Sequence, residues 1–315
     1  MRCLGQRESA SKLRQKNTAD RSELLQYYSL LLPVMAVIFI FCYLPMYGLV
    51  IAFQDYFPGS PFIGEYVTWV GLEHFVNFIR GEYFLRLIGN TLYLSILNLL
   101  FGFTAPIVFA LLLDQVRNLR LKKFVQTASY MPYFISSVVV AGMVISFVDT
   151  DGLITQALAA IGLPKQNWRI MPNAFPVTYT VTNVWKNFGF SSILYFSTIS
   201  SIDPALYESA RIDGANRWQQ MIYITLPSLL PIIAINLIMA IGRILSSNTE
   251  LILLLYTPAV YDRADVIGTY TYRLGIVGGQ YSYTAAAGLF MSVIGFSLTY
   301  VANRVSNRLT GYGLW

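Results

Sequence analysis

Long uncharged stretches constrain this chain more than any other feature. Each of them can supply the roughly 20 apolar residues of a helix that crosses a bilayer. Five such stretches lie at residues 24–54, 87–113, 124–148, 218–242 and 274–303. Only 12% of the 315 residues are charged, against about 25% in an ordinary soluble domain. These features exclude a soluble globular protein and predict an all-α, polytopic membrane protein.

A sixth stretch is interrupted by a single charge. Residues 170–202 contain Lys186 as their only charged residue. The flanking pieces, 170–185 and 187–202, are each too short to span a bilayer comfortably. We therefore predict one span over about 175–200 with Lys186 inside it, and six transmembrane helices in total.

The charges between the spans predict the orientation. With the N-terminus in the cytoplasm, the inner segments carry 14 basic and seven acidic residues, whereas the outer segments carry seven basic and nine acidic residues. Excess Lys and Arg is typical of short cytoplasmic connections. We expect a multi-pass protein of the cell membrane, surrounded by lipid, with both termini in the cytoplasm. The net charge of +6 follows from this topology and indicates no nucleic-acid partner.

The first apolar stretch follows a polar N-terminal segment. It exceeds the roughly 7–15 residues of a signal-peptide core, so we expect an uncleaved span. We expect no disulfide, because Cys3 lies on the reducing side and Cys42 in the membrane. The single His74, in an outer connection, cannot form a metal site by itself, and we expect no bound metal.

The connection after the first span, about 55–86, is rich in aromatic residues, glycine and proline. Aromatic side chains gather at the headgroup level of membranes, so an interfacial belt is one interpretation. Direct contact with a partner protein is the other. We expect the outer connections 149–174 and 244–280 to be exposed as well.

One compact charged segment, YESARIDGANRWQQMIYITLP, lies between the fourth and fifth spans. Asp203 and Pro204 are typical of a helix start, and Gly214 is typical of a helix end in the left-handed conformation. Asn216 and Gln219 have the spacing of a capping box. The pattern predicts a short cytoplasmic helix, a turn, and a second helix that runs into the fifth span.

The first of these two helices can dock in a protein groove or lie on the bilayer surface. Its apolar stripe, Leu206 and Ala210, is small and lacks the Trp or Phe of a good interfacial anchor. Small alanines permit close approach, while Glu208 and Asp213 offer carboxylates to basic groups of a partner. The pattern favours the protein groove.

The charged segment resembles the EAA loop of permease subunits in ATP-binding-cassette (ABC) importers. That loop usually reads Glu-Ala-Ala, three residues, Gly, nine residues, Ile, one residue and Leu-Pro, and the matching residues here are Glu208, Ser209, Ala210, Gly214, Ile224, Leu226 and Pro227. Ser209 departs from the usual Ala but is equally small. Other fragments resemble the branch that imports oligosaccharides and polysaccharides: YLPMYGLVIAFQDY (43–56), WVGLEHF (69–75), NTLYLSI (90–96), YMPYFISSVVV (130–140) and YSYTAAAGLF (281–290).

The resemblance implies the type I ABC importer permease (MetI-like) fold. It divides the chain into a cytoplasmic tail, a first span with its extracellular segment, a permease core of five helices, and a second cytoplasmic tail, at 1–25, 26–86, 87–303 and 304–315. It also implies a second homologous permease as heterodimer partner, two ABC ATPase subunits, an extracellular solute-binding protein, and a saccharide cargo.

The resemblance also assigns a coupling role to the EAA loop at about 203–220, which would dock in an ATPase groove. The residues implied in this coupling are Glu208, Ser209, Ala210, Asp213, Gly214, Ala215 and Arg217. The chain contains no Gly-x4-Gly-Lys-Ser/Thr phosphate loop. We therefore expect ATP and Mg on the partner ATPases, and in this chain a transport subunit with no catalytic residue and no cofactor.

The path of the cargo is suggested by polar residues in and near the fourth and fifth spans. Lys186 costs roughly 3 kcal/mol in hydrocarbon, so it faces the bundle interior or snorkels, and it hints at an anionic cargo. Sugars need flat aromatic faces beside amides. The candidates are Tyr179, Asn183, Trp185, Lys186, Asn187 and Asn236, followed by Arg243 and Glu250 near the outer interface. Alternatively, Trp185 and Lys186 anchor a span whose register is shifted by several residues.

Other functional classes fit the sequence less well. A self-contained secondary transporter or channel would need acidic residues in the membrane or inverted repeats, and no Asp or Glu falls within the predicted spans. An intramembrane enzyme would need paired catalytic groups at one depth. Within the ABC importers, a permease for a non-sugar solute remains the alternative.

Overall fold

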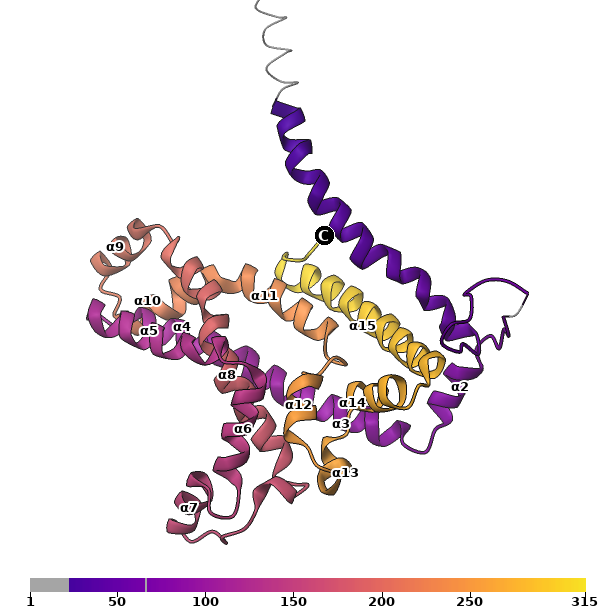
Figure 1. Cartoon of the computed structure of the whole chain (residues 1–315). Coiled ribbons are helices and arrows are strands. Elements are labelled where there is room, and N and C mark those ends of the chain that lie inside the picture. The colour runs from indigo at the N-terminus through magenta and orange to yellow at the C-terminus, as the bar shows by residue number, and fades with distance from the viewer. Residues whose placement is uncertain (1–22, 66) are drawn as a thin grey trace, which may run out of the picture. The chain divides into compact units, whose positions relative to one another are not determined.

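The computed structural model describes residues 23–65 and 67–315 as an almost wholly helical chain (Figure 1). The chain forms two compact units, which divide between Gly71 and Leu72. Among the described residues no strand occurs beyond one isolated β-bridge. An all-α fold was predicted from the sequence and is confirmed.

The first unit begins with a long helix. The stretch Glu23–Phe53 is long and apolar enough to cross a membrane, as predicted, and its side chains are largely exposed. It consists of an α-helix at 23–38, the π-helix η1 (Phe39–Tyr43) and the 3₁₀-helix η2 (Leu44–Phe53). Exposed apolar side chains on every face are what a lipid-embedded helix requires.

The aromatic segment after η2 folds back on itself. Gln54 pairs with Trp69 in the isolated bridge, and the Gln54 side-chain amide donates to the carbonyl oxygen of Phe62 at 2.9 Å. The ring of Phe62 stacks on Tyr56 with centroids 5.3 Å apart. Part of the predicted aromatic belt therefore packs internally, and its contact with lipid or a partner stays a prediction.

The predicted N-terminal tail, 1–25, consists largely of residues outside the described part of the chain, and Cys3 is among them. Cys42 lies in η1 as an exposed free thiol. The predicted absence of a disulfide between them is therefore not tested.

The second unit holds four further stretches long and apolar enough to cross a membrane: Phe84–Asp114, Ser137–Ala160, Arg217–Gly242 and Tyr281–Thr310. The sixth predicted span corresponds to helix α8 (Phe175–Ser200), which has the predicted bounds. Its Asn, Lys, Ser and Thr side chains make it more polar than the five helical stretches of the described residues that are both long enough and apolar enough to cross a membrane. The count of six spans therefore depends on α8.

Several helices build these stretches. Before them, α2 covers Glu73–Arg80, and the first two stretches contain α3 (Phe84–Leu97), the π-helix η3 (Asn98–Gly102), α4 (Phe103–Asp114), α6 (Ser137–Val148) and α7 (Leu153–Ala160). A short 3₁₀-helix, η4, covers Trp168–Ile170. The last two stretches contain α10 (Arg217–Gln220), the π-helix η5 (Met221–Thr225), α11 (Leu226–Gly242) and α15 (Tyr281–Thr310).

Three π-helices precede prolines. η1 and η5 each end two residues before a proline, Pro45 and Pro227, and η3 lies shortly before Pro106 in α4. Proline lacks an N–H, and its ring clashes with the carbonyl group of the preceding turn. A wider π-turn accommodates the ring where no water is at hand to satisfy the backbone.

The third predicted span, 124–148, is not a single helix. α5 (Leu119–Phe134) ends where Ile135 adopts an extended backbone conformation. Ser136 then caps α6, because its Oγ accepts a hydrogen bond from the backbone N–H of Val139 at 3.3 Å. The predicted third span therefore exists with other bounds, Ser137–Ala160, because the uncharged run 124–148 hid a local cap.

The prediction that residues 244–280 form an exposed connection is also wrong, since this segment is largely helical and partly buried. It contains α12 (Thr249–Leu255), the 3₁₀-helix η6 (Pro258–Val260), α13 (Tyr261–Ala264), α14 (Ile267–Thr271) and the π-helix η7 (Tyr272–Val277). Leu251 and Ile252 are fully buried in one core cluster with Leu94 of α3 and Ala141 of α6. The helices are too short to show a periodic signal, and only tertiary packing reveals them.

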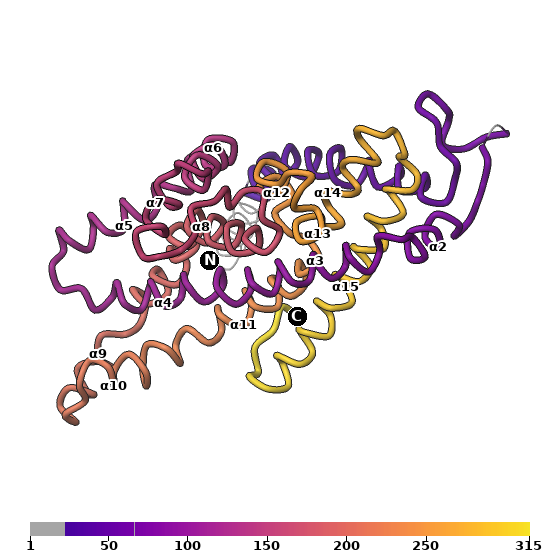
Figure 2. Tube along the Cα trace, turned by 90° about the horizontal axis from the view of Figure 1, so that it is seen from below, coloured from indigo at the N-terminus to yellow at the C-terminus, as the bar shows by residue number. Residues whose placement is uncertain are grey.

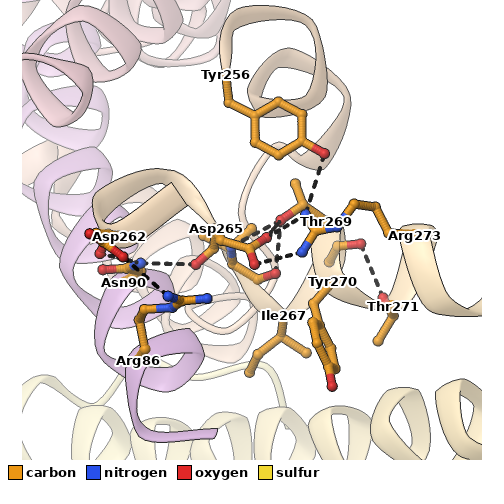
Figure 3. Close-up of polar contacts among 12 residues, drawn as sticks. Arg86, Asn90, Tyr256, Asp262, Asp265, Ile267, Thr269, Tyr270, Thr271 and Arg273 are labelled. Carbon is orange, nitrogen blue, oxygen red and sulfur yellow. Dashed lines mark hydrogen bonds and ion pairs between the residues drawn. The ribbon is translucent and has the colours of Figure 1, made fainter. Parts of the chain in front are cut away.

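Buried polar contacts fasten this segment to α3 (Figure 3). The guanidinium of Arg273 donates to both carboxylate oxygens of Asp265, at 2.8 and 2.7 Å, and the Thr269 hydroxyl donates to Asp265 at 2.6 Å. The side-chain amide of Asn90 in α3 donates to the backbone carbonyls of Asp262 and Asp265, both at 3.0 Å. We call these contacts of Asn90, Asp265, Thr269 and Arg273 the polar clamp.

The polar clamp also affects the electrostatics of Arg273. The hydrogen bond to Asp265 raises the pKa of the Arg273 guanidinium above its usual range, although partial burial acts in the opposite direction. A bidentate pair of this kind is among the strongest hydrogen-bonded arrangements in proteins. The buried carboxylate of Asp265 therefore has its charge compensated in place.

Glycines permit two close helix crossings. α11 and α15 cross where a Cβ on Gly295 would lie 2.8 Å from the carbonyl oxygen of Gly242. α5 and α8 cross where a Cβ on Gly189 would overlap the backbone of Ser129. Small residues let backbones approach each other, and the resulting van der Waals packing contributes to helix association in lipid.

Asp265→Ala is expected to destabilise the protein by about 3 kcal/mol, because it leaves the partly buried Arg273 without its carboxylate. The matched control is Asp262→Ala, whose carboxylate pairs with Arg86 at 3.1 Å. The Asp262 side chain is 77% exposed, against 1% for Asp265, and such a surface pair contributes only about 0–1 kcal/mol. Thermal unfolding of the purified protein in detergent compares the two. Equal losses would contradict the polar clamp.

Candidate functional site

The charged segment folds into the predicted helix, turn and helix. α9 (Pro204–Ile212) is capped by Asp203, whose carboxylate accepts a hydrogen bond from the backbone N–H of Ala205 at 2.9 Å. Gly214 follows with a φ of +83°, and the N–H of Ala215 donates to the carbonyl of Ala210 at 2.8 Å. This is the left-handed helix end that the sequence predicted.

The second helix of the segment, α10, starts with the predicted capping box. The backbone N–H of Asn216 donates to the Gln219 side chain at 2.7 Å, and the N–H of Gln219 donates to the Asn216 side chain at 2.9 Å. The Gln220 side chain donates to the carbonyl of Ala215 at 2.8 Å, which closes the turn. α10 then continues through η5 into α11.

Two side-chain contacts join the segment to the bundle. The hydroxyl of Tyr207 lies 2.9 Å from that of Thr225, which is buried at the end of η5. The Arg217 guanidinium donates to the carbonyl of Gln115, just after α4, at 3.4 Å. Figures 1 and 2 show α9 and α10 side by side at one end of the second unit. Of the predicted coupling residues, Arg217 thus contacts the bundle itself.

The other predicted coupling residues lie at or near the surface of this element. Glu208, Ser209 and Asp213 are exposed, and no described residue pairs with the Glu208 carboxylate. Two large apolar side chains missed by the sequence analysis are exposed beside them: Ile212 at the end of α9 and Trp218 in α10. The exposed apolar surface is therefore larger than the predicted stripe. An apolar residue two positions before the left-handed Gly214 was the signal that could have indicated it.

A cavity of about 960 Å³, with several amide side chains in a largely apolar wall, lies between η3, α8 and α11. Of the predicted cargo residues, it is lined by Tyr179, Asn183, Asn187, Asn236 and Arg243. The sequence analysis missed Asn98, Asn248 and an aromatic pair in the same wall: the rings of Tyr133 and Phe190 stack with centroids 3.9 Å apart. Phe190 lies on α8, and its position three residues after Asn187 was the signal that could have indicated it, whereas Asn98, Asn248 and Tyr133 lie on other elements.

The amides in this wall form one network. The Asn183 side-chain amide donates to Asn98 at 2.9 Å, and its carbonyl oxygen accepts from Asn248 at 3.2 Å and from Asn187 at 3.2 Å. The Tyr179 hydroxyl accepts from the backbone N–H of Asn248 at 3.1 Å. Three elements, η3, α8 and the start of α12, are therefore joined through Asn183.

Trp185, Lys186 and Glu250 do not line this cavity. Tyr179, Asn183 and Asn187 follow the four-residue spacing of one helix face, and the two intervening residues point elsewhere. Trp185 lines a separate, apolar cavity of about 1030 Å³ between α6, α7 and α8. The Lys186 ammonium donates to the hydroxyl of Ser137 at 2.8 Å. Because both residues lie near the middle of α8, a register shift of several residues is not required.

Comparison with known proteins places the chain among transport proteins. Residues 102–311 match the model of the family described as binding-protein-dependent transport system inner membrane component. The chain is 38% identical over 289 residues to the polygalacturonan/rhamnogalacturonan transport system permease protein YteP of Bacillus subtilis, covering 91% of this chain and 89% of that one. It is 37% identical over 290 residues to protein LplB of the same organism, covering 91% and 90%.

Comparison with solved structures also places the chain among transport proteins. A chain in the crystal structure of a bacterial alginate ABC transporter, in complex with an alginate pentasaccharide-bound periplasmic protein, superposes with a TM-score of 0.84. It is 43% identical, and the match covers 94% of this chain and 98% of that one. A second structure, of a bacterial ABC transporter that imports the acidic polysaccharide alginate, gives a TM-score of 0.83 at 44% identity.

Asn183→Ala is expected to destabilise the protein by about 1–2 kcal/mol, because Asn98 and Asn248 lose their shared partner. Asn236→Ala is the control: Asn236 lines the same cavity, but its amide donates only within its own helix, to the carbonyl of Ile232 at 2.8 Å. Differential scanning fluorimetry of both purified variants measures the difference. A melting temperature for Asn183→Ala no lower than that for Asn236→Ala would refute the network's structural role.

Proposed function

The chain belongs to the binding-protein-dependent transport system inner membrane components, and we propose that it forms, with a second permease, the path of an ATP-driven importer for a saccharide. Permease subunits of this kind are not enzymes. The observation that carries the ATP-driven part of the proposal is the α9–α10 element, which is internally braced, joined to α11, and exposed on its outer side.

This element has the properties of a coupling device. Its turn is fixed by Gly214 and by the capping box, so a push on α9 moves α10 as well. The unpaired Glu208 and the exposed Ile212 supply a charge and an apolar contact for a groove in another protein. We propose that Glu208, Ser209, Ala210, Asp213, Gly214 and Ala215 dock in an ATPase subunit, while Arg217 holds the element to α4.

The saccharide part of the proposal is supported by the chemistry of the amide-lined cavity. Amide groups can bond sugar hydroxyls, and the stacked rings of Tyr133 and Phe190 offer an apolar face to a sugar ring. A non-sugar solute would have less use for several amides beside aromatic rings. The relatives named for polygalacturonan and alginate transport give independent support.

The remaining partners follow from the same proposal. A solute-binding protein on the outer face would deliver the cargo, and two ATPase subunits on the cytoplasmic face would bind ATP and Mg. Closure of the ATPases would move α9, and α11 would carry the movement to the cavity. The protein would sit in the cell membrane with α9 and both termini on the cytoplasmic side.

Glu208→Ala and Gly214→Ala are expected to uncouple ATP hydrolysis from transport while leaving membrane insertion intact. The first removes the docking charge, and the second adds about 1 kcal/mol of strain at the positive φ. In reconstituted vesicles, cargo-loaded binding protein should no longer stimulate ATP hydrolysis, and uptake should fall.

Gly162→Ala is the matched control for Gly214→Ala. Gly162 ends α7 with a φ of +91°, and the N–H of Leu163 donates to the carbonyl of Leu158 at 3.1 Å, the same capping geometry as at Gly214. α7 lies away from α9 (Figure 1). Equal uncoupling by both glycine variants, or normal uptake in the Glu208 and Gly214 variants, would refute the coupling role.

The orientation can be tested with single cysteines. In a chain without Cys3 and Cys42, Ile212→Cys in α9 should react with a membrane-impermeant maleimide only in inside-out vesicles, and Ile161→Cys beyond α7 only in right-side-out vesicles. These two side chains are 87% and 75% exposed, so both positions are accessible to the reagent. The opposite labelling pattern would reverse the proposed topology.

A further inference from the structure

Arg243 occupies a break between two helices. α11 ends at Gly242, and the backbone N–H of Ser246 donates to the carbonyl of Arg243 at 2.8 Å in the turn that follows. α12 starts only at Thr249, after the cap residue Asn248. Irregular backbone at membrane depth is tolerated where it is buried in protein or lines a water-filled cavity, and residues of this break line two cavities.

The break separates two cavities. The amide-lined cavity lies on one side, and a second cavity of about 520 Å³ lies on the other, between α11, α14 and α15. Both are lined by Met239, Arg243, Ser246 and Ser247. Small residues, among them Gly242 and Gly295, form much of the second wall and leave room beside the arginine.

Arg243 is the only charged residue among those that line either cavity. Its side chain is exposed, and within the described part of the chain no acceptor contacts its guanidinium. Two other arginines of the second unit have an acidic partner: Arg273 is paired with Asp265, and Arg86 with Asp262. A guanidinium without an internal acceptor, in a cavity without an acid, keeps its full capacity to bind an anion from outside.

Two simpler roles can account for an arginine at this position. A positive charge is favourable at the C-terminus of α11, and an arginine near an interface can reach lipid headgroups. Neither role depends on the charge of the cargo. A preference for anionic over neutral cargo would follow only from contact between Arg243 and the solute.

We propose that Arg243 is a specificity-determining residue that binds a carboxylate of the saccharide, so that the cavity selects acidic over neutral sugars. The inference rests on the proposed saccharide import. Asn183, Asn187 and the aromatic pair Tyr133 and Phe190 would hold sugar hydroxyls and rings, and Arg243 would form two parallel N–H···O bonds with the acid group. Lys186, which donates to Ser137 outside this cavity, has no part in it.

The test uses the complete transporter in lipid nanodiscs, without the binding protein, so that the preference of the permeases is read directly. The two probes are a fluorescent short oligogalacturonate and its carboxyl-reduced, uncharged counterpart. The variants are Arg243→Gln and Arg243→Lys, with Arg263→Gln as control, since Arg263 is exposed on α13 and lines neither cavity. Size-exclusion profiles establish that each complex is assembled.

The wild type should bind the acidic probe more tightly than the neutral one. Arg243→Gln should raise the Kd for the acidic probe roughly tenfold, the usual effect of losing a hydrogen bond to a charged group, and leave the neutral probe unchanged. Arg243→Lys should lie between, because it keeps the charge and loses the bidentate geometry. Arg263→Gln should keep the wild-type preference.

Three outcomes overturn the proposal: no preference in the wild type, including failure of both probes to bind; an equal change for both probes in Arg243→Gln; or the same loss of preference in Arg263→Gln. ATP-dependent uptake of either saccharide by the wild type, with binding protein present, tests the proposed function separately. Uptake without an Arg243-dependent preference would refute only the role of Arg243. Absence of uptake for both saccharides would refute the import of such sugars itself.

Discussion

Polar groups that leave water for a bilayer must find partners inside the protein, and this requirement organises the second unit. Asp265 is buried against Arg273, and the carbonyl groups nearby hold Asn90 of α3. The continuation of α3, η3, brings Asn98 to Asn183 of α8. The polar clamp and the amide network are thus two parts of one arrangement that share the same span. A polar group in either part that lacked its partner would remain without a hydrogen bond in an apolar medium, which is energetically costly.

A single helical path connects the coupling element to the cavity wall. α10, η5 and α11 run without interruption over Arg217–Gly242, which is about 40 Å at 1.5 Å per residue. One end is joined to α9 by the Gly214 turn, in which the N–H of Ala215 donates to the carbonyl of Ala210, and the other ends at the break that contains Arg243. Near that end the Gly242–Gly295 crossing holds α11 against α15 at backbone distance. The continuous helix can therefore transmit a displacement of α9 to the residues that line both cavities.

Local signals in the sequence predicted local structure well, and long-range packing lay beyond them. Asp203, Gly214 and the capping box at Asn216 fixed the helix ends because each acts within a few residues. The sequence predicts an exposed connection at 244–280, because the burial of its short helices depends on distant contacts, with α3, α6 and α8. The spacing of residues on α8 indicated one face of the cavity, whereas Asn98 and Asn248 could not be assigned to it, since they reach that face from other elements.

The contrast between two arginines shows why composition cannot separate structural from functional charges. Arg243 and Arg273 both lie in the region between α11 and α15, and both were counted as outer positive charges. Asp262 forms an ion pair with Arg86, and Asp265 forms one with Arg273. Neither aspartate lines either of the two cavities beside Arg243. With these acids used elsewhere, the positive charge of Arg243 is left uncompensated beside the cavities. Because acidic side chains decide which cation is neutralised internally, the placement of two aspartates determines which arginine supports the fold and which can meet a solute.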